Sequence, residues 1–458
     1  MSIDDLEWPA IDRGDSWRLV DLLLEGGHLE LVIRAAYEQG EWSCAEAAAR
    51  ELCRVGEHER ARGVLEPFVA AGERSAVLAM AHTLIRCGRI DEALELARPD
   101  NTGPESDGAC FDFVKLLAAA GRVDEAIDFL LPRLGGWWLT STLVEITEGQ
   151  DRDERVLELL DPLAESARHA RGKARWNHPC SNAQELQALV LERSGRADEA
   201  IRILGEDVAA GRFLVQNTLT AYAELLLRHG HVEALRELGT GPRAGVALRY
   251  YARALEDAGR AEEAEQVLRE FIDSAEHPDR FRWPLIELLA RRSRLDEAVE
   301  VGRPTFDYHD ACLLEGVIHL LQEAGRPEDA LALLDERSTE FVEDHFSWLS
   351  SNRLWLLGEA GRYDEALEYA ATLPADEYRL LETKAWLLAD SGRVEEALAL
   401  LRAGGTAHLS DLAEILATHG RAAEALAVLP MVAEQRAAKE AKTPVPTDDH
   451  GYALEPPC

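Results

Sequence analysis

The sequence has few basic residues, few aromatic residues and few cysteines, and it has no long hydrophobic run. Its 458 residues include 85 acidic but only 49 basic residues, which gives a formal net charge of -36. That charge repels phosphate backbones and anionic lipid, whereas nucleic-acid binding draws most of its affinity from basic residues. No apolar segment approaches the roughly 18 residues that suggest a membrane span. We therefore expect neither a nucleic-acid partner nor a membrane partner.

The seven cysteines are odd in number, scattered and without a C-x-x-C pair, which is typical of a reducing compartment. The N-terminal segment MSIDDLEWPA is acidic and lacks the basic start and apolar stretch of a secretory signal. Arginine outnumbers lysine 44 to 5, as in proteins from GC-rich bacterial genomes. These features predict a cytoplasmic protein of bacterial origin.

The chain also lacks the motifs of common catalytic sites. It contains no G-x-x-x-x-G-K-[ST] loop, no G-x-S-x-G elbow, no H-E-x-x-H helix and no G-x-G-x-x-G after a strand. Potential metal ligands stand together twice, without the paired spacing of a zinc site, at His178 with Cys180 and at His309 with Asp310 and Cys312. We therefore expect no enzymatic activity, no metal and no cofactor.

What the sequence does contain is helix-forming residues. Hydrophobic residues make up 47% and aromatic residues 6%, so the apolar content is carried by leucine and alanine, which lose least on entering a helix. Runs of alternating valine, isoleucine and threonine, which indicate strands, are missing. The composition therefore predicts an all-α fold.

A short segment recurs along the chain. Its nine clear copies are GRIDEAL from Gly88, GRVDEAI from Gly121, GRADEAI from Gly195, GRAEEAE from Gly259, SRLDEAV from Ser293, GRPEDAL from Gly325, GRYDEAL from Gly361, GRVEEAL from Gly392 and GRAAEAL from Gly420. Looser copies begin at Gly27, Gly56 and Gly230, and a degraded copy begins at Gly149. Twelve intervals span the 393 residues from Gly27 to Gly420, a mean period near 33. Such a period is typical of stacked helical repeats.

Each copy is expected to form a turn between two helices. Apolar residues recur at helical spacing before the turn, as at Leu381 and Ala385, and after it, as at Ala397 and Leu401. The glycine can adopt the left-handed conformation that ends a helix, and the acidic pair complements the dipole of the next helix. An alanine stands five residues after the start of all nine clear copies, as close helix packing requires.

The G-x-x-[DE]-E-A turn, with an apolar helix before it and a period near 33, resembles the tetratricopeptide repeat over roughly residues 15–436. The resemblance implies a right-handed superhelical solenoid of about 13 antiparallel helix pairs. The family prefers a small residue seven positions before the turn, which is met at Ala81, Ala188, Ala252, Ala385 and Ala413 but not at Val114, Ile318 and Leu354. Ankyrin repeats share the period but need a T-P-L-H-like segment, and pentatricopeptide repeats bind RNA, which the charge disfavours.

We predict one solenoid domain over residues 1–436 and a disordered tail over residues 437–458. The interval from Gly149 to Gly195 is 46 residues, about 13 longer than the mean, so an extended repeat is expected near 149–195. The tail contains proline and polar residues without periodicity, which is typical of disorder.

In the family that the chain resembles, the first helix of each repeat lines a concave groove. The resemblance implies that groove-facing positions lie six, ten and thirteen residues before the turn. Candidate partner-binding residues at these positions are His82, Phe111, Lys115, Arg249, Arg253, Trp283, His319, Trp348, Trp355 and Trp386. Tryptophan and arginine often anchor interfaces. Alternatively, the tryptophans fill gaps between adjacent first helices.

Two sets of basic residues are further candidates. A basic patch of Arg168, Arg171, Lys173 and Arg175 could bind an acidic segment or phosphate, or fold back on the acidic surface of the chain itself. The arginine that follows each turn glycine would form a row along one edge of the stack. The overall acidity favours pairing of these arginines with nearby carboxylates over an anion-binding strip.

These observations predict a protein-binding scaffold or adaptor that holds a partner peptide or helix in the concave groove. The alternative is a ligand-sensing regulatory subunit of a larger complex, and a third hypothesis is an accessory to an enzyme in another polypeptide.

Overall fold

The computed structural model describes residues 17–99, 106–171, 182–211, 215–276, 278–306, 312–374, 379–405 and 408–428. Over these ranges the chain forms 27 α-helices and no β-strand, so the predicted all-α fold is confirmed. Its contacts divide the chain into two compact units. Unit 1 holds Asn101–Tyr378, and unit 2 holds Ser2–Asp100 together with Arg379–Cys458. The predicted tail over residues 437–458 lies outside the described residues.

Each turn joins two helices, which we call the first and the second helix of a pair. The pairs of unit 1 are α7 (Ser106–Ala119) with α8 (Val123–Leu130), α9 (Trp137–Ile146) with α10 (Asp153–Arg171), α11 (Ala183–Arg193) with α12 (Ala197–Ala209), α13 (Thr220–Arg228) with α14 (Val232–Gly239), α15 (Ala244–Asp257) with α16 (Ala261–Ser274), α17 (Asp279–Arg291) with α18 (Leu295–Gly302), α19 (Cys312–Glu323) with α20 (Pro327–Asp335), and α22 (Phe346–Glu359) with α23 (Tyr363–Thr372). Short elements between the pairs are η2 (Leu131–Arg133), η3 (Val215–Leu219), η4 (Arg303–Thr305) and α21 (Thr339–Asp344).

Unit 2 brings together helices from both ends of the sequence. Its pairs are α1 (Trp17–Glu25) with α2 (Leu29–Gln39), α3 (Trp42–Arg54) with α4 (His58–Ala70), α5 (Arg74–Arg86) with α6 (Ile90–Ala97), α24 (Leu380–Asp390) with α25 (Val394–Gly404), and α26 (Leu409–Thr418) with α27 (Ala422–Ala427). Helix α1 packs against α26, so the first and last described pairs of the chain are in direct contact.

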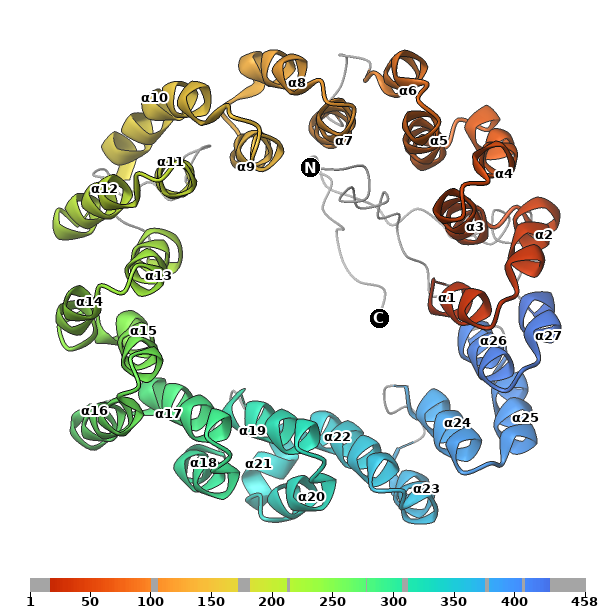
Figure 1. Cartoon of the computed structure of the whole chain (residues 1–458). Helices are drawn as coiled ribbons and strands as arrows, with labels where there is room; N and C mark the ends of the chain where they lie inside the picture. The colour runs from red at the N-terminus through yellow and green to blue at the C-terminus, as the bar shows by residue number, and fades with distance from the viewer. Residues whose placement is uncertain are drawn as a thin grey trace, which may run out of the picture. The chain divides into compact units, whose positions relative to one another are not determined.

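Within unit 1 the first helices form one layer and the second helices form the other (Figure 1). Consecutive first helices pack against each other, as α7 does against α9 and α15 against α17. Each second helix also packs against the next first helix, as α16 does against α17. This is the stacked solenoid arrangement that the 33-residue period predicts.

The turns end their helices as expected from their glycines. The twelve turn glycines have φ between 66° and 85°, at Gly27, Gly56, Gly88, Gly121, Gly149, Gly195, Gly230, Gly259, Gly325, Gly361, Gly392 and Gly420. At one of them, the Gly392 amide donates to the carbonyl of Ala389 at 2.9 Å, and the next amide donates to the carbonyl of Leu388 at 2.8 Å. This pattern caps the last carbonyls of the first helix. Ser293 takes the same place in its turn, with φ 59°.

The alanine column is buried in the helix pairs. All nine members are 0% exposed: Ala93, Ala126, Ala200, Ala264, Ala298, Ala330, Ala366, Ala397 and Ala425. A larger side chain there would push the helices of a pair apart, because the interior is already close-packed. The prediction that this column serves packing is confirmed.

The longest helix among the described residues falls in the interval where the sequence period is lengthened. Helix α10 has 19 residues and includes Pro162.

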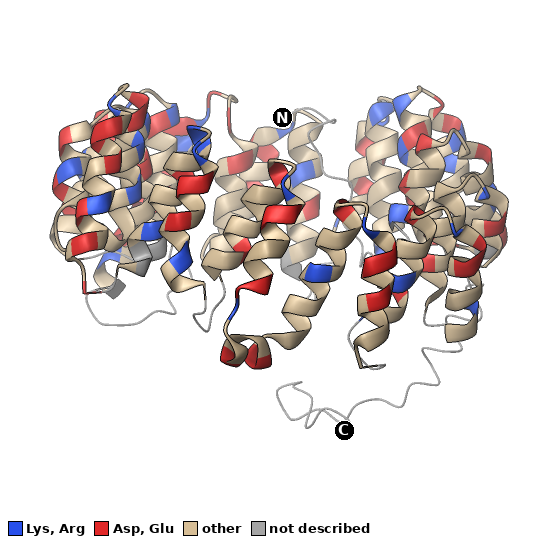
Figure 2. Cartoon of the chain, turned by 90° about the horizontal axis from the view of Figure 1, so that it is seen from below, with Lys and Arg blue, Asp and Glu red and all other residues tan. Residues whose placement is uncertain are grey.

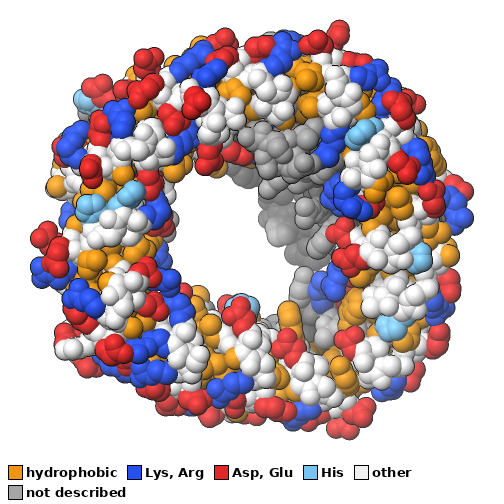
Figure 3. Space-filling view, in the orientation of Figure 1, with side chains coloured by type: hydrophobic (Ala, Val, Ile, Leu, Met, Phe, Trp, Pro, Cys, Tyr) orange, Lys and Arg blue, Asp and Glu red, His pale blue; other side chains and the backbone are white. Residues whose placement is uncertain are grey.

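On the surface, acidic and basic residues are interspersed along the helices (Figure 2). The space-filling face in Figure 3 likewise shows side chains of both signs intermixed with scattered hydrophobic ones. Mixed charge of this kind favours local ion pairs over a strong field of one sign at any one place.

Candidate functional site

The ten groove candidates all lie on first helices, but they differ widely in exposure. His82 on α5 is only 7% exposed, and its burial, together with Arg86 nearby, lowers the pKa of the imidazole to about 4. A neutral and buried imidazole packs inside unit 2 rather than facing a partner. On α22, by contrast, Trp348 is half-buried and Trp355 is 65% exposed. The hypothesis that these residues bind a partner therefore depends on the exposed members of the ten candidates.

Two of the tryptophans pack between helices. A Cβ atom at Gly316 of α19 would clash with the ring of Trp283, so this indole of α17 lies directly on the backbone of α19. Trp386 of α24 donates its Nε1–H to Oδ1 of Asp411 on α26 at 3.0 Å. These contacts agree with the alternative that tryptophans fill gaps between adjacent first helices.

The arginine candidates on α15 and the histidine candidate on α19 contact neighbouring side chains. The Arg249 guanidinium donates to the hydroxyl of Tyr250 at 2.6 Å. Arg253 pairs with Asp257 at 3.0 Å, one turn along the same helix. His319 lies 3.3 Å from a carboxylate oxygen four residues later in α19. All three contacts are local, and the pairs of Arg253 and His319 are exposed, so a partner could exchange these two pairs at little energetic cost.

Four side chains on α7 and α9 form a surface that we call the aromatic platform: Phe111, Lys115, Trp137 and Trp138. The ring centroids of Phe111 and Trp138 are 5.7 Å apart in an edge-to-face arrangement, and those of the two tryptophans are 5.8 Å apart. The Lys115 ammonium lies 4.5 Å from the centroid of Phe111 and 3.0 Å from a carboxylate oxygen of Glu145. Trp137 and Trp138 are 58% and 53% exposed. The platform therefore exposes two indoles to solvent, beside a lysine whose charge is balanced by Glu145.

Sequence reasoning missed the two platform tryptophans. Counting back six and ten residues from the turn at Gly149 reaches Leu143 and Leu139, which are both buried. Trp137 and Trp138 instead begin α9, directly after the short η2 and a pair of glycines. The doublet of large aromatic residues after two glycines, in a chain with only 10 tryptophans, was the available signal.

The candidate basic patch is only partly described by the structure. Arg168 donates through Nε to Oδ2 of Asp207 at 2.9 Å, and this carboxylate is buried. Arg171 is the last residue of α10, and Lys173 and Arg175 lie outside the described residues. Arg168 is therefore paired with a buried carboxylate of unit 1.

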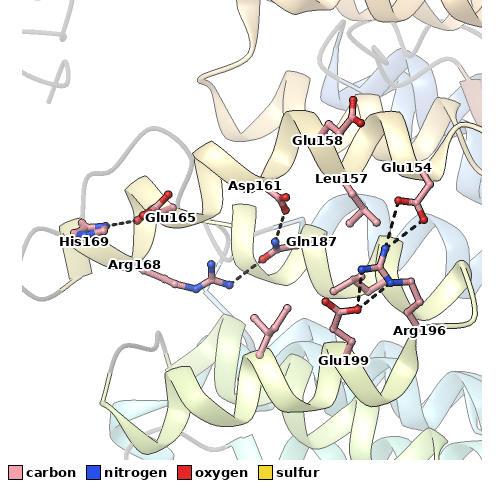
Figure 4. A pocket seen from close by; sticks show the side chains of 12 residues that line it. Glu154, Leu157, Glu158, Asp161, Glu165, Arg168, His169, Gln187, Arg196 and Glu199 are labelled. Atoms are coloured by element: carbon pink, nitrogen blue, oxygen red, sulfur yellow. Dashed lines mark hydrogen bonds and ion pairs between the residues drawn. The ribbon is translucent and has the colours of Figure 1, made fainter.

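A groove of about 600 Å³ lies between α10 and α12, above α11 (Figure 4). Arg196 pairs in it with Glu154 and Glu199, and Gln187 accepts from Arg168 and donates to Asp161 at 2.6 Å. The carboxylates that line the groove are Glu154, Glu158, Asp161, Glu165 and Glu199. Since carboxylates outnumber the two arginines of the lining, the groove disfavours the acidic segment or phosphate that the basic patch suggested.

The arginine row is paired throughout its length. In all nine clear repeats this arginine binds the carboxylate three residues later: Arg89–Glu92, Arg122–Glu125, Arg196–Glu199, Arg260–Glu263, Arg294–Glu297, Arg326–Asp329, Arg362–Glu365, Arg393–Glu396 and Arg421–Glu424. Five of these arginines also reach a carboxylate of the preceding repeat, at Glu154, Glu265, Asp296, Glu328 and Glu395. The pairing that the sequence predicted is confirmed, and the row offers no free cationic strip.

Models of one repeat family match several segments of the chain. A model described as tetratricopeptide repeat matches residues 75–99, 245–270, 318–336 and 379–403. A second model, described as tetratrico peptide repeat, matches residues 152–226. The chain is a tetratricopeptide-like repeat protein. The first model's match at 75–99 covers α5 and α6, and its match at 379–403 covers α24 and most of α25.

Three solved structures are similar to this tetratricopeptide-like chain. The pentatricopeptide repeat protein PPR10 from maize is 16% identical, with 96% of this chain and 77% of that chain covered and a TM-score of 0.33. Yeast Tom70 is 12% identical, with 87% and 92% covered and a TM-score of 0.29. The Naa15/Naa10 complex bound to HypK-THB is 14% identical, with 85% and 68% covered and a TM-score of 0.35. None of the curated proteins matches the chain.

The larger residues that depart from the tetratricopeptide pattern are buried in the core. Val114, Ile318 and Leu354 stand where the family prefers a small residue, and they are at most 3% exposed. Ala385 and Ala413, which follow the family preference, are 0% exposed. Both residue sizes are therefore packed between helices of the same array.

Within the described ranges, no group of three or more His, Cys, Asp or Glu side chains could hold a metal ion. Of the ligand candidates, Cys312 is exposed at the start of α19, while His178, Cys180, His309 and Asp310 fall outside those ranges. No helix of the part that the structure describes is long and apolar enough to cross a membrane.

Proposed function

We propose that the chain is a protein-binding scaffold or adaptor that holds a partner peptide or helix against its first-helix layer. The observation that carries the proposal is the aromatic platform. Trp137 and Trp138 expose more than half of their side chains, although water contact on large aromatic surface is unfavourable. Exposed indoles supply large contact area with a polar N–H, and such residues dominate the binding energy of interfaces.

The charge of the chain restricts the partner. A net charge of -36 disfavours acidic segments and nucleic acid, so the partner is expected to be a protein segment that is neutral or basic. Around the platform, Lys115 is already neutralised by Glu145, so its charge does not demand an acidic group in the ligand. Trp355 on α22 is a second exposed anchor on the same layer of unit 1.

The test is a selection of displayed random peptides on the full-length protein, followed by affinity measurements on variants. We expect peptides selected on the wild type to bind the W137A/W138A variant at least about tenfold more weakly, as for interface anchors. The matched control is Leu189→Ala on the neighbouring first helix α11, where an apolar side chain that is 46% exposed is removed outside the platform. Its affinity should stay within about twofold of the wild type. Unchanged circular dichroism would show that both variants are folded.

Three outcomes would count against this function. Peptides that bind the double variant as tightly as the wild type would remove the platform from the binding surface. Micromolar binding of single-stranded RNA at physiological salt would replace the protein partner by nucleic acid. A small molecule retained through purification would instead favour a ligand-sensing regulatory subunit.

A further inference from the structure

The first helix of the chain packs on the last described repeat. Helix α1 buries Leu19, Val20 and Leu23, which are at most 1% exposed, and it contacts α26 as well as its sequence neighbours α2 and α3. Figure 1 shows α1 beside α26 within unit 2. Within each unit a first helix can lie between the first helices of the adjacent pairs, as α3 does between α1 and α5 and α15 does between α13 and α17. Helix α1 packs against α3 on one side. On its opposite side it packs against α26, which is far from it in the sequence.

Polar groups of α24 and α26 meet the start of α1. The Arg18 guanidinium lies 5.5 Å from the centroid of the Trp386 ring and 3.5 Å from Oε2 of Glu414, which is only 8% exposed. Asp411 accepts from the indole N–H of Trp386 at 3.0 Å and from Arg379 at 3.3 Å. The indole is therefore held at its edge by a carboxylate of α26 and covered on its face by a cation from α1, an arrangement that attracts the guanidinium.

A helical repeat buries its apolar face only against a neighbour, so the last repeat of an array needs a cap. Four apolar residues of α26 are at most 3% exposed: Leu412, Ala413, Ile415 and Leu416. Helix α1 stands where the first helix of a further repeat would stand. It is amphipathic, as such a helix must be, with its buried residues at one side and Arg18 61% exposed.

We propose that the surface of α24 and α26 is a helix-binding surface whose resident ligand is the chain's own α1. The kind of ligand that it fits is a short amphipathic helix with an arginine at its N-terminal end. By filling this surface, α1 caps the C-terminal repeats. It thereby couples the local unfolding of residues 17–97 to that of residues 379–428. This inference is independent of the proposed partner binding at the aromatic platform, which lies in unit 1.

Hydrogen exchange on the full-length protein, followed by mass spectrometry, tests the proposal. Arg18→Glu brings a carboxylate up to Glu414 and removes the cation from Trp386, so the amides of α26 should exchange about threefold to tenfold faster. The matched control is Arg34→Glu on α2, which loses an exposed pair with Glu38 and should leave exchange in α26 unchanged. Equal exchange in α26 for Arg18→Glu and the wild type would overturn the proposal.

A stronger pair of variants separates capping from general loss of stability. Leu19→Asp places a charge in the buried side of α1, and we expect exchange in α26 to rise more than tenfold. The control is Leu94→Asp, which places a charge at a buried position of α6, where Leu94 is 3% exposed. Helix α6 also lies in the N-terminal part of the chain, but it packs on α5. If both variants speed exchange in α26 equally, α1 is not its specific ligand. A synthetic peptide of residues 17–25 that restores the protection in the Leu19→Asp variant would support the binding surface directly.

Discussion

At the scale of single residues, Ser293 shows what the turn requires. It replaces glycine in one of the nine clear copies, yet it takes the same left-handed conformation, with φ 59°. A side chain in this conformation costs roughly 1–2 kcal/mol, because Cβ crowds the following carbonyl. The Ser293 side chain is exposed, so glycine at this position would lose no buried contact.

We expect Ser293→Gly to raise the free energy of unfolding by about 0.5–1 kcal/mol, because relief of strain exceeds the entropy that glycine adds to the unfolded chain. The reverse change, Gly361→Ser, should lower it by about 1 kcal/mol, since Gly361 has φ 70°. Urea unfolding at equilibrium measures both variants. A Ser293→Gly variant that is less stable than the wild type would show that the turn is not strained.

At the scale of elements, ion pairs link the second helices of adjacent repeats. Glu265 of α16 is 14% exposed and lies 2.5 Å from Nη1 of Arg294 at the start of α18. The hydrogen bond with Arg294 is the largest cause that lowers the pKa of the Glu265 carboxyl below 4.5, and Arg269 adds to it. Such a group stabilises the fold above its unfolded pKa, and the contribution disappears as the pH falls through the lowered folded pKa.

We expect Glu265→Gln to lower the free energy of unfolding at pH 7 by about 1 kcal/mol, the range of partly exposed charge-assisted hydrogen bonds. The difference from the wild type should shrink as the pH falls below about 4.5, because protonated Glu265 no longer pairs with arginine. Glu276→Gln, at an exposed site, is the control and should have no effect at either pH. A difference that does not shrink at all as the pH falls would mean that the substitution acts through packing.

At the scale of the whole molecule, the charge balance opposes the stability of the fold. The ion pairs are mostly local and exposed, so each contributes about 0–1 kcal/mol. The net charge of -36, in contrast, adds repulsion between all parts of a folded chain. Salt screens both effects, but the excess of 85 acidic over 49 basic residues makes repulsion the larger of the two.

Raising sodium chloride from about 10 mM to about 300 mM should therefore raise Tm by a few degrees, since the Debye length falls from roughly 30 Å to below 8 Å. Differential scanning calorimetry measures this change. Potassium fluoride at equal ionic strength should give a similar increase if screening is the cause. A Tm that falls with added salt would show that the local ion pairs dominate.

Interactions within one repeat were predictable from the sequence, whereas contacts between distant residues were not. The turn glycines, the alanine column and the pairing of the arginine row follow from residues within about one repeat of each other, and they were predictable. The outcome at the candidate site was mixed. Trp283 packs on α19 and Trp386 on α26, whereas Trp355 is exposed, although all three satisfy the same spacing rule.

The sequence by itself determined the helical pairs, their period and the family, because each repeat forms its turn and its core from its own residues and from those of its nearest neighbours. Only the tertiary structure decided which aromatic side chains face solvent and what covers the last repeat. Exposure of Trp137 and Trp138 depends on how α9 follows η2, and the contact of Arg18 with Trp386 joins residues more than 360 positions apart. No periodic pattern encodes a contact between residues this far apart, because the period reports only on interactions between neighbouring repeats.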